Sequence, residues 1–554
     1  MHQPTVTLRY ICKGESHVQY FVGELNNEDV KVVSSWQDNT YRLVLTAKQP
    51  LTVTRLSMSA AIHPKIGDKL FFNGYQSWTD SRERSIKGRI RTLTPLAKAL
   101  NSKYHLSQYG DYNFVSTDRK RGHLHGFTYA YLRRGLRYHL LASLNEDTGF
   151  TVFKYDNDRH IITVEKDCSG LQLKADVPYE GFAVALLNGS ETAVFDRWFT
   201  LMNIQPPRVQ PKTGYTSWYQ HYQNISEAII KENLNAMAHS ATKFDIFQID
   251  DGFQTAVGDW LSIDGNKFPN GMKPMADAIK EAGMMPGLWL APFVCETTSE
   301  IYRNHFDWLL KDENGDAVSA GCNWSGSWAL DIYNPQVQSY LRKVFDVVLN
   351  QWGFELVKLD FLYAACILPR KDKTRGQVMA EGMDFLRDCV GDKLILGCGV
   401  PLGSAFGKVD YCRIGCDVGL DWNDKLYMRM MHRERVSTKY AIYNTIYRRQ
   451  LNGRAFLNDP DVFFLRDERL SLTTGQKTAL STVNGLFGSL LFTSDNVGLY
   501  NAQKAQAIQD IFALKKAENI RVEKVGNVLH ITWTQSQKIH KCIIDMKTGF
   551  CTGL

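Results

Sequence analysis

The feature that most constrains the fold of this chain is a repeated alternation of strand and helix patterns between residues 213 and 515. Short apolar runs are followed by amphipathic runs, of which 226–240 and 336–353 are the clearest helix patterns. The second of these follows Asn334 and Pro335, a capping residue and a proline at the first helical position. About eight such units in one stretch predict a central (β/α)8 TIM barrel, which closes a parallel sheet on itself.

The predicted barrel strands are short and apolar. They cover 214–220, 244–251, 285–293, 355–363, 393–399, 411–417, 453–459 and 489–495, with 328–332 as a further short candidate. An open, doubly wound sheet is the alternative arrangement of the same elements. It is disfavoured because no glycine-rich phosphate loop follows any of these strands.

The flanking sequence has a different texture. Residues 1–190 alternate apolar and polar positions in short runs separated by turns, which predicts a large antiparallel N-terminal β-sandwich. Residues 191–212 read as a linking helix and a proline-rich joint, and 213–515 as the barrel. Residues 516–554 return to alternating strands and predict a small C-terminal antiparallel β domain.

Composition excludes several classes of function. The net charge of +7 is spread along the chain without a dense Lys/Arg run, so neither nucleic acid nor a membrane surface is expected as a partner. The amino terminus lacks an apolar segment, and no apolar run approaches the roughly 20 residues of a spanning helix. The 11 cysteines lack CxxC spacing; even Cys412 and Cys416 are one residue too far apart. We therefore expect a cytoplasmic protein with reduced thiols, without metal or cofactor.

Polar and aromatic residues collect where the predicted strands end. Because catalytic groups of TIM barrels lie at the carboxyl ends of the strands, these residues are expected around one site. They are Trp218, Asp250, Asp251, Trp289, Lys358, Asp360, Cys398, Arg413 and Asp417. Carboxylates that accept hydroxyl hydrogen bonds, together with flat indole faces, predict a sugar site.

Two carboxylates from different strands, without metal ligands, indicate glycoside hydrolysis. Lys358 and Asp360 are two residues apart in a strand and so share a face, and a nearby cation favours an ionised carboxylate suited to nucleophilic attack. The alternative reading of this pair is a structural ion pair. An acid at Asp417 must keep its proton, so Arg413 is expected to orient the loop or meet a substrate hydroxyl instead of touching Asp417. The NDPD segment is interpreted as a turn, with Asp459 or Asp461 capping a helix.

Eleven short motifs carry a resemblance that runs through most of the chain. They are NGYQSW (73–78), SWYQHY (217–222), QIDDGFQ (248–254), GDW (258–260), FPNGM (268–272), GLWLAPF (287–293), LDIYNP (330–335), VKLDFLY (357–363), GCGVPLG (397–403), RIGCD (413–417) and LNDPD (457–461). With them the chain resembles the α-galactosidases of glycoside hydrolase family 36, of the short microbial type. The resemblance implies an N-terminal β-supersandwich, a catalytic (β/α)8 barrel and a C-terminal β domain. Departures are KLD where many members have KWD, and Gly415 where many have serine.

The resemblance implies a role for each matching residue. Asp360 would be the nucleophile and Asp417 the acid/base. Asp250 and Asp251 would bind the galactose 4- and 6-hydroxyls. The other implied substrate-binding residues are Lys358, Cys398, Arg413, Trp218, Trp289 and, from the N-terminal part, Trp78.

The implied activity is that of a retaining, exo-acting α-galactosidase on small oligosaccharides of the melibiose or raffinose type. An α-N-acetylgalactosaminidase and an α-galactosyl transglycosidase stay open as alternatives, as does, from another class, a sugar-binding protein that has lost catalysis. Intact Asp360 and Asp417 argue against the last. Whether the chain forms a homo-oligomer also stays open.

Overall fold

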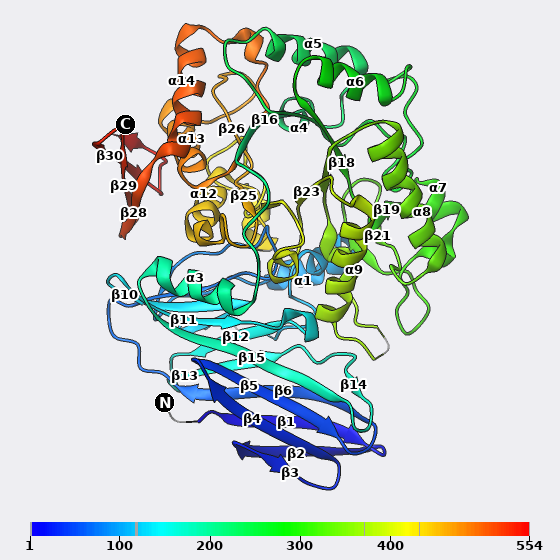
Figure 1. The fold of residues 1–554 in the computed structure, drawn as a ribbon, viewed down its shortest axis with the longest axis vertical. Coiled ribbons are helices and arrows are strands. Elements are labelled where there is room, and N and C mark those ends of the chain that lie inside the picture. Colours follow the sequence, from blue (N-terminus) through cyan, green and yellow to red (C-terminus); the bar gives the residue numbers. More distant parts are fainter. Residues whose placement is uncertain (1–2, 117–119, 371, 432, 553–554) are drawn as a thin grey trace.

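The computed structural model describes residues 3–116, 120–370, 372–431 and 433–552. Figure 1 shows three regions: a β-rich N-terminal part, a barrel surrounded by helices, and a small sheet near the carboxyl end. Among the described residues, no helix has the length and apolar character needed to cross a membrane.

The N-terminal region consists of two antiparallel sheets that enclose one apolar core. In β1 (Thr5–Cys12), alternate side chains from Val6 to Cys12 are buried, the period expected of a strand with one face on a core. The first sheet contains β2 (Glu15–Val22), β1, β6 (Leu51–Ala61), β13 (Ile161–Lys166), β12 (Thr151–Asp156) and β9 (His123–Phe127), with β14 (Gln172–Leu173) paired to β6. The second contains β3 (Leu25–Asn26), β4 (Val30–Gln37), β5 (Thr40–Ala47), β15 (Pro178–Gly189), β11 (Arg137–Ser143), β10 (Tyr129–Arg134), β7 (Lys69–Phe72) and β8 (Arg84–Ser85).

A helix leads from this region into the barrel. Helix α3 (Glu191–Leu201) begins after Ser190, whose hydroxyl accepts from the amide of Ala193. Its buried Trp198 donates from Nε1 to the carbonyl of Ser143 at 2.9 Å. This hydrogen bond joins α3 to the second sheet, and the first barrel strand follows the helix.

The barrel is a parallel sheet whose strands are almost wholly buried, which explains their continuous apolar sequences. Its strands are β16 (Lys212–Thr216), β17 (Ile246–Ile249), β18 (Met285–Leu290), β22 (Leu356–Leu359), β23 (Leu394–Gly397), β24 (Tyr411–Arg413), β25 (Leu457–Asp459), β26 (Val462–Phe463) and β27 (Leu490–Thr493). Strand β25 pairs with β24, and β26 pairs with β27, which in turn pairs with β16. Since only Pro460 and Asp461 separate β25 from β26, they are two pieces of the seventh barrel strand, and the sheet closes.

The helices of the barrel largely follow the sequence patterns. Helix α5 (Glu227–Ala238) matches the pattern at 226–240, helix α6 (Lys273–Glu281) is a further amphipathic helix, and α9 (Arg375–Val390) begins with a capping box. Asn334 caps α8 (Pro335–Asp346), as predicted, and one wider π-helical turn (η4, Val347–Gln351) follows it.

One predicted barrel strand lies elsewhere. The segment 328–332 contributes β21 (Ser327–Ala329) to a three-stranded antiparallel sheet with β19 (Val294–Glu296) and β20 (Ser319–Gly321). This small sheet lies in the long excursion between β18 and β22. The segment is too short and too close in sequence to β20 to form a barrel unit of its own.

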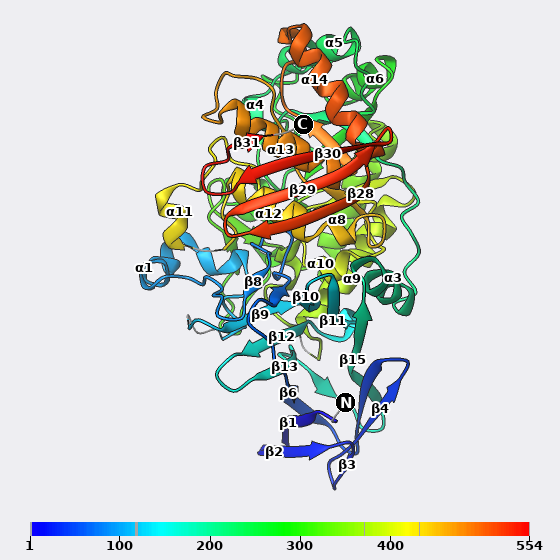
Figure 2. The same cartoon turned by 90° about the vertical axis from the view of Figure 1, so that its left-hand side faces the viewer.

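Strands β28 (Glu518–Val525), β29 (Val528–Gln535), β30 (Lys538–Asp545) and β31 (Cys551–Thr552) form the C-terminal antiparallel sheet. Figure 2 shows it lying across the outside of the barrel over α12 (Thr438–Tyr447) and α13 (Thr474–Phe487), near α14 (Ala502–Ala513).

Candidate active site

A cavity of about 560 Å³ opens where the barrel strands end. Its size is in the range of about 300–1,000 Å³ that is usual for small-molecule sites. The lining consists of Trp78, Tyr104, Leu106, Tyr109, Trp218, Asp250, Asp251, Trp289, Cys322, Asn323, Trp324, Lys358, Asp360, Phe361, Cys416, Asp417, Tyr427, Met428, Glu434 and Val436.

Asp360 directly follows β22 and is held from two sides. Its Oδ1 accepts from the amide of Phe361 at 2.9 Å, and its Oδ2 accepts from Nε1 of Trp289 at 3.1 Å. Phe361 has a φ of 54°, the left-handed region that non-glycine residues rarely adopt, so the chain turns sharply after the carboxylate. The carboxylate is therefore fixed towards the cavity, with lone pairs left on both oxygens.

Lys358 forms its hydrogen bond with Asp250, at 2.9 Å between Nζ and Oδ2. Burial alone would lower the pKa of Lys358, but the charges of Asp250 and Asp360 outweigh it and raise that pKa above its ordinary value. The ammonium group is therefore charged and lies in the field of both carboxylates, with Asp250 as its direct partner.

The two consecutive carboxylates after β17 are almost saturated with protein donors. Asp250 Oδ2 also accepts from Gln248 at 2.9 Å and from Thr216 at 3.2 Å, whereas its Oδ1 accepts only from the amide of Asp251. Asp251 Oδ2 accepts from Trp324 and Gln223, both at 2.9 Å, and its Oδ1 from Gln254 at 2.6 Å.

Each of these two carboxylates therefore keeps a spare lone pair on Oδ1. Both residues line the cavity. Burial raises the pKa of Asp251, although the three side-chain donors oppose this. The pair is a rigid double acceptor at the cavity wall.

The expectation that Arg413 avoids Asp417 is wrong. Arg413 donates from Nη1 to Asp417 Oδ1 at 2.8 Å, from Nε to Asp459 at 3.1 Å, and pairs through Nη2 with Asp461 at 3.0 Å. The interpretation of NDPD as a helix cap is also wrong, because Asp459 ends β25 and Asp461 lies in the break before β26. Sequence alone could not show that three carboxylates from two segments meet one guanidinium.

The aromatic walls come from three separate parts of the chain. Trp218 begins the short helix α4 (Trp218–His221) after β16, and Trp289 lies in β18. Trp78 extends into the cavity from the N-terminal region. Its Nε1 is 3.3 Å from the sulfur of Cys398, which follows β23 of the barrel. A buried arginine, Arg448, holds the loop that carries Trp78, donating to Asn73 at 2.9 Å and to the carbonyl of Gln76 at 3.1 Å.

The structure brings together all the site residues named from the sequence, but not all at the surface of the cavity. Every one lines it except Cys398 and Arg413, which are 1% and 3% exposed. Cys398 lies behind Trp78, and Arg413 lies behind Asp417. Each of them therefore affects the cavity indirectly, by positioning the lining residue that it contacts.

Several residues that line the cavity do not lie at the ends of barrel strands, so the sequence pattern did not identify them. Trp324 lies in the excursion between β20 and β21 and donates to Asp251. Tyr104 and Leu106 come from short helices of the N-terminal region, and Tyr427 and Met428 from α11 (Leu426–Met431). These loops are long and irregular, so only the tertiary fold could show that they surround the mouth.

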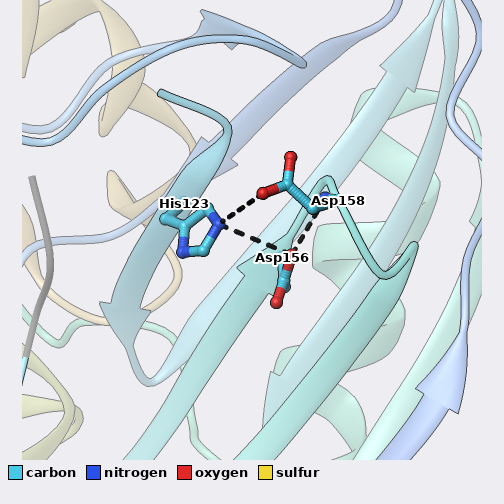
Figure 3. Close-up of side chains that lie close together, drawn as sticks. All are labelled: His123, Asp156 and Asp158. Carbon is cyan, nitrogen blue, oxygen red and sulfur yellow. Dashed lines mark hydrogen bonds and ion pairs between the residues drawn. The ribbon is translucent and has the colours of Figure 1, made fainter. Parts of the chain in front are cut away.

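A second group of polar side chains lies far from this cavity, at β9 and β12 of the first sheet (Figure 3). One ligand atom each of His123, Asp156 and Asp158 lies within 4.8 Å of the others. The distances from His123 Nε2 to the two carboxylates are 3.5 and 3.6 Å, and the ammonium of Lys120 already pairs with Asp158. This arrangement is that of a surface ion-pair group.

The known proteins that this chain resembles in sequence include several named as α-galactosidases. Residues 215–376 match the family model described as melibiase. The chain is 28% identical over 234 residues to α-galactosidase 2 of Pediococcus pentosaceus, covering 40% of this chain and 31% of that protein. It is 29% identical over 153 residues to α-galactosidase AgaA of Geobacillus stearothermophilus, covering 26% and 20%. These matches thus span less than a third of the relatives' length.

Solved structures resemble the chain over nearly its whole length. An α-galactosidase from Thermus thermophilus, solved with p-nitrophenyl α-D-galactopyranoside, superimposes with a TM-score of 0.71 at 24% identity, covering 96% of this chain and 98% of that one. The same enzyme solved with stachyose gives 0.69 at 25% identity, covering 91% and 99%. The family 36 enzyme AgaA from Geobacillus stearothermophilus gives 0.63 at 13% identity, covering 93% and 72%.

A barrel with carboxylates from different strands at its mouth is the arrangement found in barrel glycoside hydrolases. The predicted fold is confirmed. The chain thus resembles the melibiase family over residues 215–376, and its fold is that of the solved family 36 α-galactosidase.

Proposed function

We propose that this protein is an exo-acting α-galactosidase that removes terminal α-linked galactose from small oligosaccharides with retention of configuration. The observation that carries the proposal is that Asp360 and Asp417, from different barrel strands, line the same cavity as the double acceptor Asp250 and Asp251. Relatives and solved neighbours named as α-galactosidases support the same activity. A family 36 neighbour solved with raffinose supports the class of substrate.

Recognition of galactose rests on its axial 4-hydroxyl, which distinguishes it from glucose. The spare lone pairs on Oδ1 of Asp250 and Asp251 are suited to accept the 4- and 6-hydroxyls. Their other lone pairs are already filled by protein donors, so neither carboxylate can rotate to follow a differently placed hydroxyl. Trp289 and Trp218 offer flat apolar faces to the ring.

In the first step, an oxygen of Asp360 attacks the anomeric carbon. The bond between that carbon and the glycosidic oxygen breaks, its electron pair goes to the oxygen, and the proton of Asp417 passes to the departing alcohol. In the second step, Asp417 takes a proton from water, whose oxygen attacks the same carbon and releases Asp360. Two inversions give net retention.

The outer part of the cavity fits the remainder of an oligosaccharide. Tyr104 and Tyr427, which line the cavity, are 37% and 54% exposed and form an aromatic rim, and Met428 lines the cavity beside Tyr427. Aromatic faces at such a rim can pack on a second sugar ring without fixing its hydroxyls. This supports a preference for galactose at the inner position with tolerance of the leaving group.

The activity is tested by assaying hydrolysis of p-nitrophenyl α-galactoside beside p-nitrophenyl α-N-acetylgalactosaminide, followed by melibiose and raffinose. We expect turnover of the galactosides, with little on the 2-acetamido sugar. Absence of galactoside turnover in a folded preparation would refute the proposal. Efficient turnover of the 2-acetamido sugar alone would replace galactose by N-acetylgalactosamine.

The stereochemical prediction is that α-galactose is the first-formed product. Retention follows from a double displacement in which Asp360 attacks in the first step and water displaces it in the second, each step inverting the anomeric carbon. Proton NMR taken before mutarotation identifies the anomer. Early accumulation of β-galactose would rule out a covalent intermediate on Asp360.

The prediction for the double acceptor is that Asp251→Asn lowers kcat/KM on α-galactosides by about 10- to 150-fold. This corresponds to losing one charge-assisted hydrogen bond of about 1.5–3 kcal/mol. Asp250→Asn should lower kcat/KM similarly and also lower the melting temperature, because buried Lys358 loses its charged partner.

The matched control is Asp259→Asn. Asp259 is a buried aspartate outside the cavity lining that accepts from the amide of Glu300 at 2.7 Å at the start of α7 (Glu300–Asn304). This variant should melt at a lower temperature with nearly normal kinetics. If Asp251→Asn behaved like the control, Asp251 would be a structural residue.

A further inference from the structure

The seventh barrel strand is broken at the NDPD segment, and the break has an unusual backbone. Asp461 has a φ of 74°, in the left-handed region, where non-glycine residues are uncommon. Its amide donates to Asp459 Oδ1 at 2.8 Å, which closes the turn. Such a conformation persists only where the surrounding structure enforces it, and it is most frequent at functional sites.

The break directs Asp459 and Asp461 at Arg413. Together with Asp417, they engage three different nitrogens of its guanidinium group, Nε, Nη2 and Nη1. Asp459 and Asp461 are 1% and 2% exposed, whereas the side chain of Asp417 is 42% exposed and borders the cavity. Asp417, the proposed acid/base, is thus the solvent-accessible member of an otherwise buried cluster.

The charges of this cluster do not balance if every carboxylate is ionised. One guanidinium faces three carboxylates, and burial of uncompensated charge is costly. Burial raises the pKa of Asp461 to about 7. The guanidinium of Arg413 lowers this pKa, whereas the charges of Asp417 and Asp459 raise it. Asp461 is therefore the member of the cluster whose ionisation burial opposes most directly.

Two carboxylates lie beyond the cluster, Asp250 and Asp360, and both face the ammonium of Lys358. The other titratable groups near the cluster are Tyr219 of α4, which donates to Asp461, Tyr222 after that helix, Cys398 after β23 and Cys416 after β24. Burial raises the pKa of each of these tyrosines and cysteines, so all four are neutral at pH 7.

We propose that Asp461 is a positioning residue for proton transfer: with Asp459 it neutralises Arg413, so that Asp417 can carry a proton beside a guanidinium. This inference rests on the proposed function, in which Asp417 is the acid. Without the buried pair, Arg413 would hold Asp417 as a carboxylate and block donation to the leaving group. The amide of Val418, which donates to Asp461 Oδ2 at 2.8 Å, further fixes the loop that carries Asp417.

The test is the pH dependence of Asp461→Asn. Removing this negative charge leaves Arg413 with Asp459 alone, so Asp417 should lose its proton at lower pH. We expect the alkaline limb of kcat/KM on melibiose to move down by about one pH unit. At pH 8 melibiose should lose at least about 10-fold more than 2,4-dinitrophenyl galactoside, whose leaving group needs no acid.

Two further variants keep the test decisive. Asp410→Asn is the control, because Asp410 is buried and pairs with Arg387 at 2.8 Å and Arg208 at 2.9 Å but lies just before β24, at the opposite end of that strand from the cluster. It should lower stability without moving the pH profile. Tyr219→Phe removes only the phenol that stabilises ionised Asp461, so it should shift the alkaline limb in the same direction by less.

The possible outcomes separate the two hypotheses. If the pH profiles of Asp461→Asn and Tyr219→Phe superimpose on that of the wild type, the positioning role is wrong. Equal losses on melibiose and the dinitrophenyl substrate would also refute it, because they would indicate general structural damage. A wild-type protein without activity on any α-galactoside would instead refute the proposed function.

Discussion

Replacing Asp360 by asparagine is expected to lower kcat on α-galactosides by at least about 10⁴-fold. An amide cannot attack the anomeric carbon, and the covalent pathway accounts for a large share of a typical enzymatic acceleration of at least about 10⁶-fold. Because the side chain accepts from Phe361 and Trp289, asparagine keeps one of these hydrogen bonds and the shape of the pocket. Steady-state kinetics with a melting curve on the same preparation measure the effect.

Two results would contradict this role for Asp360. A folded Asp360→Asn variant that retained a tenth of the wild-type rate would exclude the residue as the nucleophile. A direct check uses 5-fluoro-α-galactosyl fluoride, which should trap the galactosyl-enzyme, followed by digestion and mass spectrometry. A label on a peptide that lacks Asp360 would assign the nucleophile elsewhere.

Replacing Asp417 by alanine is expected to lower turnover of melibiose and raffinose by about 10²- to 10⁴-fold. An aryl galactoside with a good leaving group should still form the galactosyl-enzyme, which then accumulates because water lacks its base. Azide needs no base, so added azide should restore aryl turnover and yield α-galactosyl azide. Product NMR and rates measured with increasing azide check both parts.

The anomer of the azide product decides between the two carboxylates. Asp360→Asn supplies the contrast, because azide there can enter only from the face that Asp360 normally occupies and should give the β-anomer, if any product forms. β-galactosyl azide from Asp417→Ala would exchange the two roles. Azide without effect on Asp417→Ala would remove Asp417 from the second step.

Much of the fold and part of the site could be predicted because they depend on local patterns. The alternation of strand and helix predicts the barrel, and the rule that strand ends meet at one rim groups Asp250, Lys358, Asp360 and Asp417. The Asn334 cap was also readable from neighbouring residues. Each of these inferences needs only a few consecutive positions, since backbone geometry alone sets which way their side chains point.

The partners of these side chains depend on residues far away in the chain, and only the tertiary structure decided them. Lys358 bonds with Asp250, more than a hundred positions earlier, and Arg413 bonds with Asp459 and Asp461 across the break in the seventh strand. Trp324 reaches Asp251 from a loop excursion. The sequence by itself determined which chemical groups stand at the ends of the strands. The closing of the barrel and the packing of loops against it determined which charges meet, because a buried charge must find its partner wherever the fold places one.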